Sequence, residues 1–463
     1  MTTNDNQSSA VKSLSAHAER VTSGPLARTV VALAIPVVLG QLFQFSMSII
    51  NLFWVGRLGP AAQDAITTAM VIIWTVYASA SIFTVGATAL ISRAVGAGDP
   101  ESAAKVFRQS LLFGNFVSAF YAVTGFILTP TLVAFMGTSP EASAHAIPYI
   151  RIFFFSVFFF AIEETCFAAL RASGNTKTPT FVGMLVVGIN AVLDPILIFG
   201  WGPIPALGVA GAAIASAFAM FVGAVLVVRS LGRGKLGYQV TAPFVFSPNW
   251  QTIGKVARIG LPMATQQIAF VGVYWFLMSV IHRFGEAAGA AMGIGNRMES
   301  LSYLTCWGFS IAASTLVGQN LGAGKTDRAR KGAWASVGLA VVATAITSAL
   351  FFVFPHFIAG IFSNDQEVRR IAVDYLIILG VSQTTMAIEI VLEGAFTGAG
   401  DTLPPMLVFL PGSLARIPLA YYLAISAGWG INGVWWTLTI TTLAKAAVLA
   451  VWFSRNKWQA KTL

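Results

Sequence analysis

The chain has 463 residues, of which 56% are hydrophobic and 10% are charged, and its formal net charge is +10. An ordinary soluble chain carries about 25% charged residues, so this composition excludes a typical soluble protein and predicts an integral membrane protein. Two cysteines and four histidines are too few for a disulfide framework or a His/Cys metal cluster, so we expect no metal centre.

From the amino terminus, residues 1–24 are polar and rich in serine, and we interpret them as a disordered cytoplasmic tail without a cleaved signal. Long uncharged runs follow, each longer than the roughly 20 residues that a helix needs to cross the hydrocarbon core. With the Gly, Pro and charged breaks between runs, they predict twelve spans. These spans are centred near residues 43, 78, 123, 160, 190, 218, 269, 304, 343, 385, 415 and 442. The predicted fold is therefore an all-α membrane protein.

The second half of the chain repeats the first at an offset of 226 residues. The repeated residues are Pro36 with Pro262, Gln41 with Gln267, Gly59 with Gly285, and Glu163 with Glu389. Six spans per repeat is an even number, so both repeats enter the membrane from the same side and form two parallel six-helix bundles. A tandem membrane repeat of this size is typical of transporters, whose site lies between the halves.

The predicted boundaries follow from the breaks between spans. The tail at 1–24 precedes an amino-terminal bundle at 25–231, a linker at 232–256, a carboxyl-terminal bundle at 257–455 and a second tail at 456–463. Most of the 28 Lys and Arg residues fall on one side when both termini are cytoplasmic, which predicts that orientation. The basic linker indicates attraction to anionic lipid, not to nucleic acid.

Several motifs together resemble a known family. The motifs are IPVVLGQLFQFSMSIINLFWVGRLG at 35–59, SRAVGAGD at 92–99 with VGQNLGAGK at 317–325, and LRASGNTKTP at 170–179 with FTGAGDTLPP at 396–405. The chain resembles the multidrug and toxic compound extrusion (MATE) family, most closely its DinF-like branch. The resemblance implies two six-helix bundles around a V-shaped cavity, and export of organic, often cationic, compounds driven by inward flow of protons or sodium.

Asp194 is the leading candidate for ion coupling, because an ionisable group inside a span is costly unless it faces a cavity or a partner. Asn190 lies four residues earlier and shares its helix face. A carboxylate there can exchange a proton or bind sodium, and Asn190 can fix the occupant. The alternative is an Asp that satisfies the backbone at a kink beside Pro195.

The resemblance refines this site. In the DinF-like branch the cation site matches Asn190 and Asp194, whereas its usual first-span Asp aligns with Asn51. One carboxylate fewer favours a single proton over sodium. The acidic residues of the NorM-like branch in the seventh and tenth spans align near Val271 and at Met386, so we expect no sodium site in the carboxyl-terminal half.

Other polar residues inside spans are candidates for a substrate cavity. The candidates are Glu163, Glu389, Glu393, Gln41, Gln267 and Tyr274. Glu389 and Glu393 share a helix face that could attract a cation or carry protons, and Tyr274 could hold a flat cation against its ring. The alternative, equally weighted, is structural ion pairing. In that case Glu163 or Glu164 pairs with Arg171, and Glu393 pairs with Arg416 or Lys445.

These observations, with the resemblance, predict a secondary multidrug efflux transporter that exports organic, mostly cationic, compounds in exchange for protons, with sodium as the alternative ion. We expect a monomer in the plasma membrane with no cofactor and no nucleic-acid partner. A lipid-linked oligosaccharide flippase of the same superfamily is the alternative, but it needs a large cationic cavity, and only Arg416 and Lys445 lie deep in predicted spans. An intramembrane enzyme would need a nucleophile with a base, and no catalytic set is visible.

Overall fold

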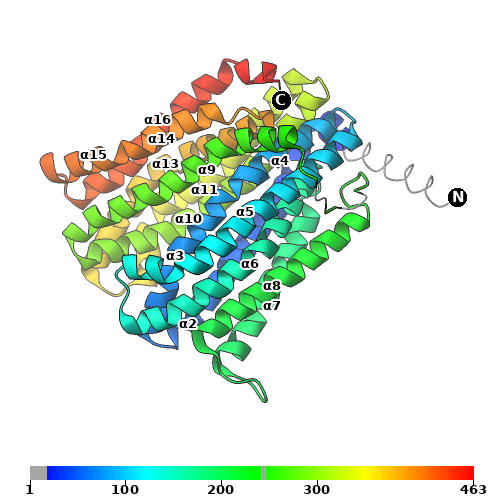
Figure 1. Cartoon of the computed structure of the whole chain (residues 1–463). Coiled ribbons are helices and arrows are strands. Elements are labelled where there is room, and N and C mark those ends of the chain that lie inside the picture. Colours follow the sequence, from blue (N-terminus) through cyan, green and yellow to red (C-terminus); the bar gives the residue numbers. More distant parts are fainter. Residues whose placement is uncertain (1–17, 241–242, 245–246, 463) are drawn as a thin grey trace. The chain divides into compact units, whose positions relative to one another are not determined.

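The computed structural model describes residues 18–240, 243–244 and 247–462, except for the side chains of residues 47–53 (Figure 1). Within these ranges twelve helical segments are long and apolar enough to cross a membrane, which confirms the predicted number of spans. The described chain is almost entirely helical, and its one isolated β-bridge joins Trp201 and Ile204. The all-α membrane fold is therefore confirmed.

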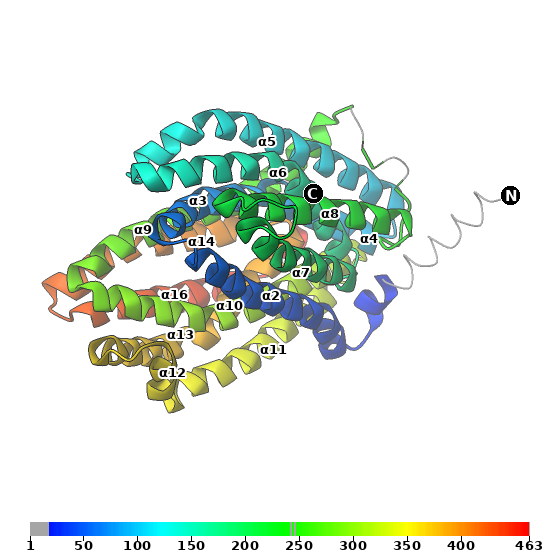
Figure 2. The ribbon, with the colours of Figure 1, turned by 90° about the horizontal axis from the view of Figure 1, so that it is seen from below.

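The chain divides into two compact units. The amino-terminal unit consists of Met1–Glu19 and Leu39–Gly260. Its helices are α3 (Pro60–Ser79), α4 (Ser81–Gly96), α5 (Pro100–Phe135), α6 (Pro140–Ala172), α7 (Lys177–Phe199) and α8 (Gly208–Gly232). In Figures 1 and 2, α5 and α6 lie side by side, as do α7 and α8.

The carboxyl-terminal unit consists of Arg20–Val38 and Leu261–Leu463. Its helices are α10 (Glu286–Gly322), α11 (Thr326–Val353), α12 (Pro355–Phe362), α13 (Gln366–Ala399), α14 (Leu403–Leu414), α15 (Arg416–Tyr421) and α16 (Ile431–Ser454). The eleventh span is assembled from α14, α15 and the π-helical turn η2 (Tyr422–Ser426). Its counterpart in the first repeat, α7, is one continuous helix.

Two long helices, α2 (Leu26–Gly56) and α9 (Trp250–Ile281), are shared between the units. Each begins in the unit of the other repeat and changes unit beside the repeated prolines, Pro36 and Pro262. The two units therefore exchange the first turns of these spans: the start of the first span belongs to the carboxyl-terminal unit, and the start of the seventh belongs to the amino-terminal unit.

Glycines permit the close contacts that hold these exchanged turns. A β-carbon on Gly308 of α10 would collide with Val38 of α2, and one on Gly260 of α9 would collide with the Ile82 backbone of α4. Only a residue without a side chain lets two backbones approach so closely.

The end of the predicted amino-terminal tail is ordered. Residues 18–23 are helical, while residues 1–17 lie outside the described part of the chain. Arg328 donates hydrogen bonds to the carbonyls of Val21 and Gly24, and Lys325 donates to the carbonyl of Thr22 at 3.1 Å. These bonds satisfy carbonyls at the end of a short helix, which otherwise lack partners.

Helix boundaries follow local sequence signals. Pro60, Pro100, Pro140 and Pro355 occupy first helical positions, where the missing N–H costs nothing. Gly98 and Gly324, in the repeated Gly-Ala-Gly segments, have positive φ values of 71° and 70° just after helices. Those segments are helix ends.

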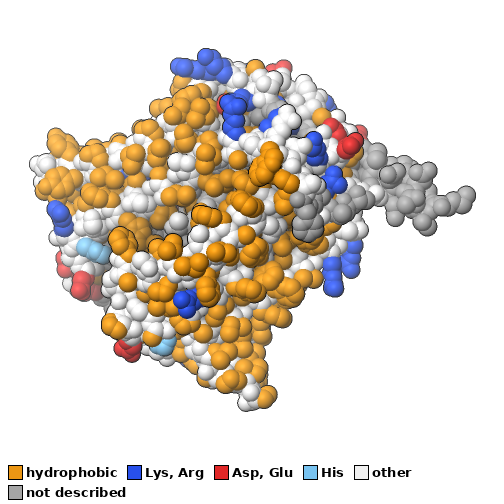
Figure 3. Space-filling view, in the orientation of Figure 1, with side chains coloured by type: hydrophobic (Ala, Val, Ile, Leu, Met, Phe, Trp, Pro, Cys, Tyr) orange, Lys and Arg blue, Asp and Glu red, His pale blue; other side chains and the backbone are white. Residues whose placement is uncertain are grey.

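The surface agrees with a membrane environment. In the face shown in Figure 3, hydrophobic side chains are spread over the surface, and Lys and Arg side chains lie mainly toward its margins. Large exposed hydrophobic residues include Trp74, Phe116, Phe135 and Val342. Such exposure would be unfavourable in water and is expected against lipid.

Candidate functional site

The amino-terminal unit contains a buried polar group on α7. The Nδ2 atom of Asn190 donates to Oδ1 of Asp194 at 3.1 Å and to the hydroxyl of Ser216 on α8 at 3.1 Å. Asp194 is 3% exposed, and the two residues share a face because they lie one helical turn apart. Asp194 also interacts electrostatically with the hydroxyl group of Tyr149 on α6. The predicted pair is thus in contact, with Ser216 as a third member.

Pro195 lies inside α7 and does not end it. Proline has no backbone N–H, so the helical hydrogen bond to the carbonyl of Ala191 cannot form. The carbonyl of Ala191, one turn before Pro195, therefore lacks its usual helical donor. It lies in the turn of α7 that precedes Pro195, close in sequence to Asp194. Carboxylate, hydroxyl and carbonyl oxygens together can hold a proton or a small cation.

Glu163 of α6 is a second buried carboxyl group in this unit. It is 7% exposed and lies against Gly223 of α8, where a β-carbon would stand 2.9 Å from its Oε1 atom. Among the described residues it has no hydrogen bond or ion pair. Its neighbour Glu164 approaches Arg171 at 3.8 Å, so of the two predicted partners of Arg171 the structure selects Glu164.

Two further predicted residues of this unit lie on α2. The side chain of Asn51 is outside the described residues, so its predicted place in the cation site stays a prediction. Gln41 is half-buried.

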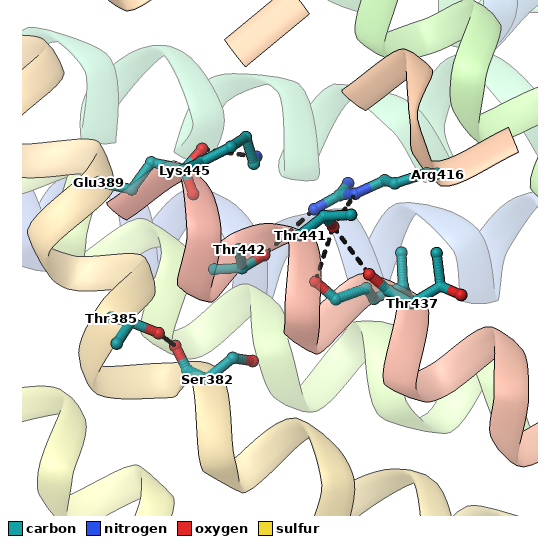
Figure 4. A network of polar contacts seen from close by, with 9 residues as sticks. Ser382, Thr385, Glu389, Arg416, Thr437, Thr441, Thr442 and Lys445 are labelled. Carbon is teal, nitrogen blue, oxygen red and sulfur yellow. Dashed lines mark hydrogen bonds and ion pairs between the residues drawn. The ribbon is translucent and has the colours of Figure 1, made fainter. Parts of the chain in front are cut away.

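The carboxyl-terminal unit contains a buried ion pair between α13 and α16. Lys445 Nζ donates to Oε1 of Glu389 at 2.6 Å, and the two side chains are 4% and 8% exposed (Figure 4). The ammonium group also lies 4.2 Å from the ring centre of Phe409 on α14. The sequence offered Lys445 as a partner of Glu393; its partner is Glu389, one turn earlier on the same helix.

Arg416 begins α15, directly after the break in the eleventh span. Its Nε atom donates to the hydroxyl of Thr441 at 2.9 Å, and its Nη2 atom donates to that of Thr442 at 3.1 Å (Figure 4). Glu299 of α10 interacts electrostatically with Arg416 and Lys445. The guanidinium group is buried and held by hydroxyl groups, and no ion pair of Arg416 occurs in the described part of the chain.

The remaining predicted residues of this unit form separate contacts. Glu393 is half-buried and accepts a hydrogen bond from the side chain of Gln266. The predicted residue Gln267, which follows Gln266 in the sequence, is also half-buried. The hydroxyl of Tyr274 donates to Oδ1 of Asn296 at 2.7 Å. The hydroxyl group of Tyr274 is therefore hydrogen-bonded, and its aromatic ring is the part that could contact a cation.

The two repeats can be aligned in sequence, residue by residue, at these sites. An offset of 226 pairs Asn190 with Arg416 and Asp194 with Ala420. For the last span of each repeat the offset is 222, because the preceding loop is shorter in the second repeat. The register is indicated by two glycines with similar positive φ values: Gly208, the first residue of α8, with 56°, and Gly430, directly before α16, with 60°.

With this register, Gly211 corresponds to Gly433, and each packs closely on the backbone of the preceding segment. Gly223 then corresponds to Lys445. The first repeat thus has an Asp, an Asn and a Gly where the second repeat has an Ala, an Arg and a Lys.

Sequence reasoning did not find Ser216, Gln266, Asn296, Thr441 or Thr442. Each is a neutral polar residue in an apolar span, and such residues often bond only to their own helix. Their partners lie on other helices, and no local spacing marks them.

Comparisons with known proteins agree with this architecture. Residues 36–196 and 262–422 each match the family MatE. Over 446 residues the chain is 27% identical to a Thermotoga maritima protein named "Probable multidrug resistance protein NorM", covering 94% of each chain. It is 24% identical over 417 residues to a Shewanella oneidensis "FAD transporter", covering 89% of this chain and 90% of that one.

A solved structure titled "Outward-facing conformation of a multidrug resistance MATE family transporter of the MOP superfamily" has the same fold. Its TM-score is 0.89 at 24% identity, and the match covers 96% of this chain and 98% of that one.

Proposed function

The chain belongs to the MatE family of membrane transporters, and from this premise we propose that it exports organic, mostly cationic, compounds in exchange for protons entering through Asp194. The observation that carries the proposal is the buried contact of Asp194 with Asn190, next to the helix proline Pro195. A carboxyl group that is buried and bonded to one neutral amide can be neutral or charged with few changes around it.

A proton suits this group better than sodium. Sodium prefers several oxygen ligands, and the amide of Asn190 turns its NH₂ group, not its oxygen, toward Asp194. The bond from Asn190 favours the ionised carboxylate, whereas burial favours the protonated acid, so these opposed effects suit a group that binds and releases a proton. Occupancy drives transport only if the inward-open and outward-open states bind the proton with different affinities.

We propose that substrate binds polar residues in each unit. In the amino-terminal unit these are Gln41 and Glu163, and in the carboxyl-terminal unit they are Gln267, Tyr274 and Glu393. Among the described residues, the half-buried Glu393 is hydrogen-bonded by the neutral Gln266 and forms no ion pair, and its carboxylate can therefore attract a cation. Glu389, also a predicted cavity residue, has its charge balanced by Lys445 and is the weaker candidate.

The experiment is efflux of ethidium from proteoliposomes that contain the purified transporter, with a proton gradient and a sodium gradient imposed separately. We expect the proton gradient alone to drive efflux. Efflux driven only by sodium would contradict proton coupling, and no efflux of any organic cation, with movement of a lipid-linked oligosaccharide, would favour a flippase.

We also propose that the protein lies in the plasma membrane with both termini in the cytoplasm, because Lys and Arg favour that side. A reporter fused after Leu463 and another inserted at residues 232–256 should both give a cytoplasmic signal. An external signal from either would contradict the orientation.

A further inference from the structure

The most informative difference between the repeats lies where the last span meets the buried glutamate. In the first repeat, Gly223 leaves space beside Glu163, whose carboxyl group forms no hydrogen bond or ion pair among the described residues. In the second repeat, the equivalent position is Lys445, and its ammonium group fills that space against Glu389 at 2.6 Å.

The ammonium group of Lys445 has the surroundings of a bound monovalent cation. It contacts a carboxylate oxygen, and it lies 4.2 Å from the centre of the Phe409 ring, whose face attracts cations. The carbon stem is confined, because a β-carbon on Gly412 would lie 2.6 Å from its Cγ atom. The charge is therefore fixed by packing as well as by pairing.

Three other charged groups act on this pair. Arg416 and Glu393 act on Lys445, and Glu299 of α10 interacts with both Arg416 and Lys445. Arg416 stands where the first repeat has Asn190, and Ala420 stands where it has Asp194. The second repeat thus lacks the coupling carboxylate and supplies its own cations.

We propose that Lys445 is a tethered cation that permanently occupies, in the carboxyl-terminal unit, the place of a mobile coupling ion, so that Glu389 takes no proton or sodium from solution during transport. Lys445 thereby sets the number of ions exchanged for each substrate. This inference rests on the proposed function, because it concerns which carboxylates exchange ions in the transport cycle.

Lys445 is then a determinant of stoichiometry. When it is removed, Glu389 remains buried without a counter-charge and must take an ion from solution. Each additional coupled proton multiplies the substrate gradient that the transporter can sustain, by about tenfold at a pH gradient of one unit.

The test measures the ethidium concentration ratio at which net flux reverses, in proteoliposomes with a pH gradient of one unit and the membrane potential held at zero. We expect Lys445→Met to raise this ratio about tenfold above wild type. The charge-balanced variant Lys445→Met/Glu389→Gln should keep the wild-type ratio, whatever its rate. This variant removes both partners of a buried pair, which proteins tolerate better than removal of one.

Two results would overturn the proposal. One is an unchanged reversal ratio in Lys445→Met protein that pumps ethidium. The other is a ratio about tenfold below wild type in the double variant, because Glu389 would then carry a proton in the native cycle. Asp194→Asn in the wild-type background tests the proposed function separately: if it still couples ethidium to protons, that function fails, whereas the Lys445 comparison keeps its own outcome.

Discussion

The fifth span and the eleventh span occupy equivalent places in the two repeats and have opposite electrostatic character. The fifth is a continuous helix with Asp194 and Asn190 on one face, and the eleventh is broken just before Arg416. Asn190 bonds a carboxylate and one hydroxyl, whereas Arg416 bonds two hydroxyls. The duplicated fold has been kept while its polar contents have diverged.

This divergence indicates a division of labour. A buried carboxyl group with neutral partners can change its charge, while a buried pair such as Lys445 with Glu389 is stable only when both partners are present. A group that can change its charge, such as Asp194, is suited to exchanging ions with solution. An ion pair whose charges stay constant, such as Lys445 with Glu389, is suited to a structural role or to supplying a permanent counter-charge. Four substitutions test this contrast.

The largest expected effect is that of Asp194→Asn. We expect it to reduce proton-driven ethidium efflux to background, because the amide cannot exchange a proton in the physiological range. The measurement is efflux from proteoliposomes at equal protein content. Asp374→Asn is the matched control, since Asp374 also accepts a bond from an asparagine, Asn432 at 3.4 Å, but in the other unit. Normal efflux by Asp194→Asn protein would remove Asp194 from the mechanism.

The second expected effect is on stability. Lys445→Met leaves Glu389 buried without its partner, and loss of one member of a buried pair costs about 3–5 kcal/mol. We expect a clearly lower melting temperature in detergent for this variant. The double variant Lys445→Met/Glu389→Gln should recover most of the loss. A double variant that melts below the single one would contradict the ion-pair account.

The third effect concerns the space beside Glu163. In Gly223→Ala, the new β-carbon would stand 2.5 Å from Cγ2 of Val186 and 2.9 Å from the carboxyl group, so the helices must move. We expect a loss of about 1–3 kcal/mol, seen as reduced melting temperature. Gly183→Ala is the matched control, because a β-carbon there meets nothing within 4 Å. Equal behaviour of the two variants would mean that Gly223 does not keep this space.

The smallest effect is at the start of α5, where Asp99 caps the helix and its repeat counterpart is Lys325. Asp99 accepts from the Ser102 backbone at 2.9 Å, whereas Lys325 makes no side-chain cap bond. Bonds from the Ser102 side chain and backbone lower the pKa of the Asp99 carboxyl group. Asp99→Ala should therefore cost about 0.5–2 kcal/mol.

This cap also gives the effect a pH dependence. Because the folded pKa lies below the unfolded value of about 3.9, the charge-dependent stability is complete above that pH and disappears as the pH falls through the folded pKa. Asp99→Asn keeps a capping acceptor and should lose this dependence. Melting curves between pH 3 and 6 compare the variants, and parallel curves for Asp99→Asn and wild type would exclude the effect.

Much of the architecture could be predicted because it depends on local properties of the chain. Uncharged runs longer than a bilayer thickness predict spans, and the recurrence of Pro36 as Pro262 and of Glu163 as Glu389 predicts a duplication. The contact between Asn190 and Asp194 was also predictable, since residues four apart on a helix share a face.

Local sequence patterns therefore predict the membrane class, the twelve spans, the repeat and the residues most costly to bury. Which charges neutralise one another depends instead on how distant helices pack together. Lys445 lies 56 residues from Glu389, and Ser216 lies 26 residues from Asn190, so no helical period relates the partners. The physical reason is that pairing strength depends on a few ångströms between side chains of different helices, a distance set by packing and by glycines such as Gly223 and Gly412.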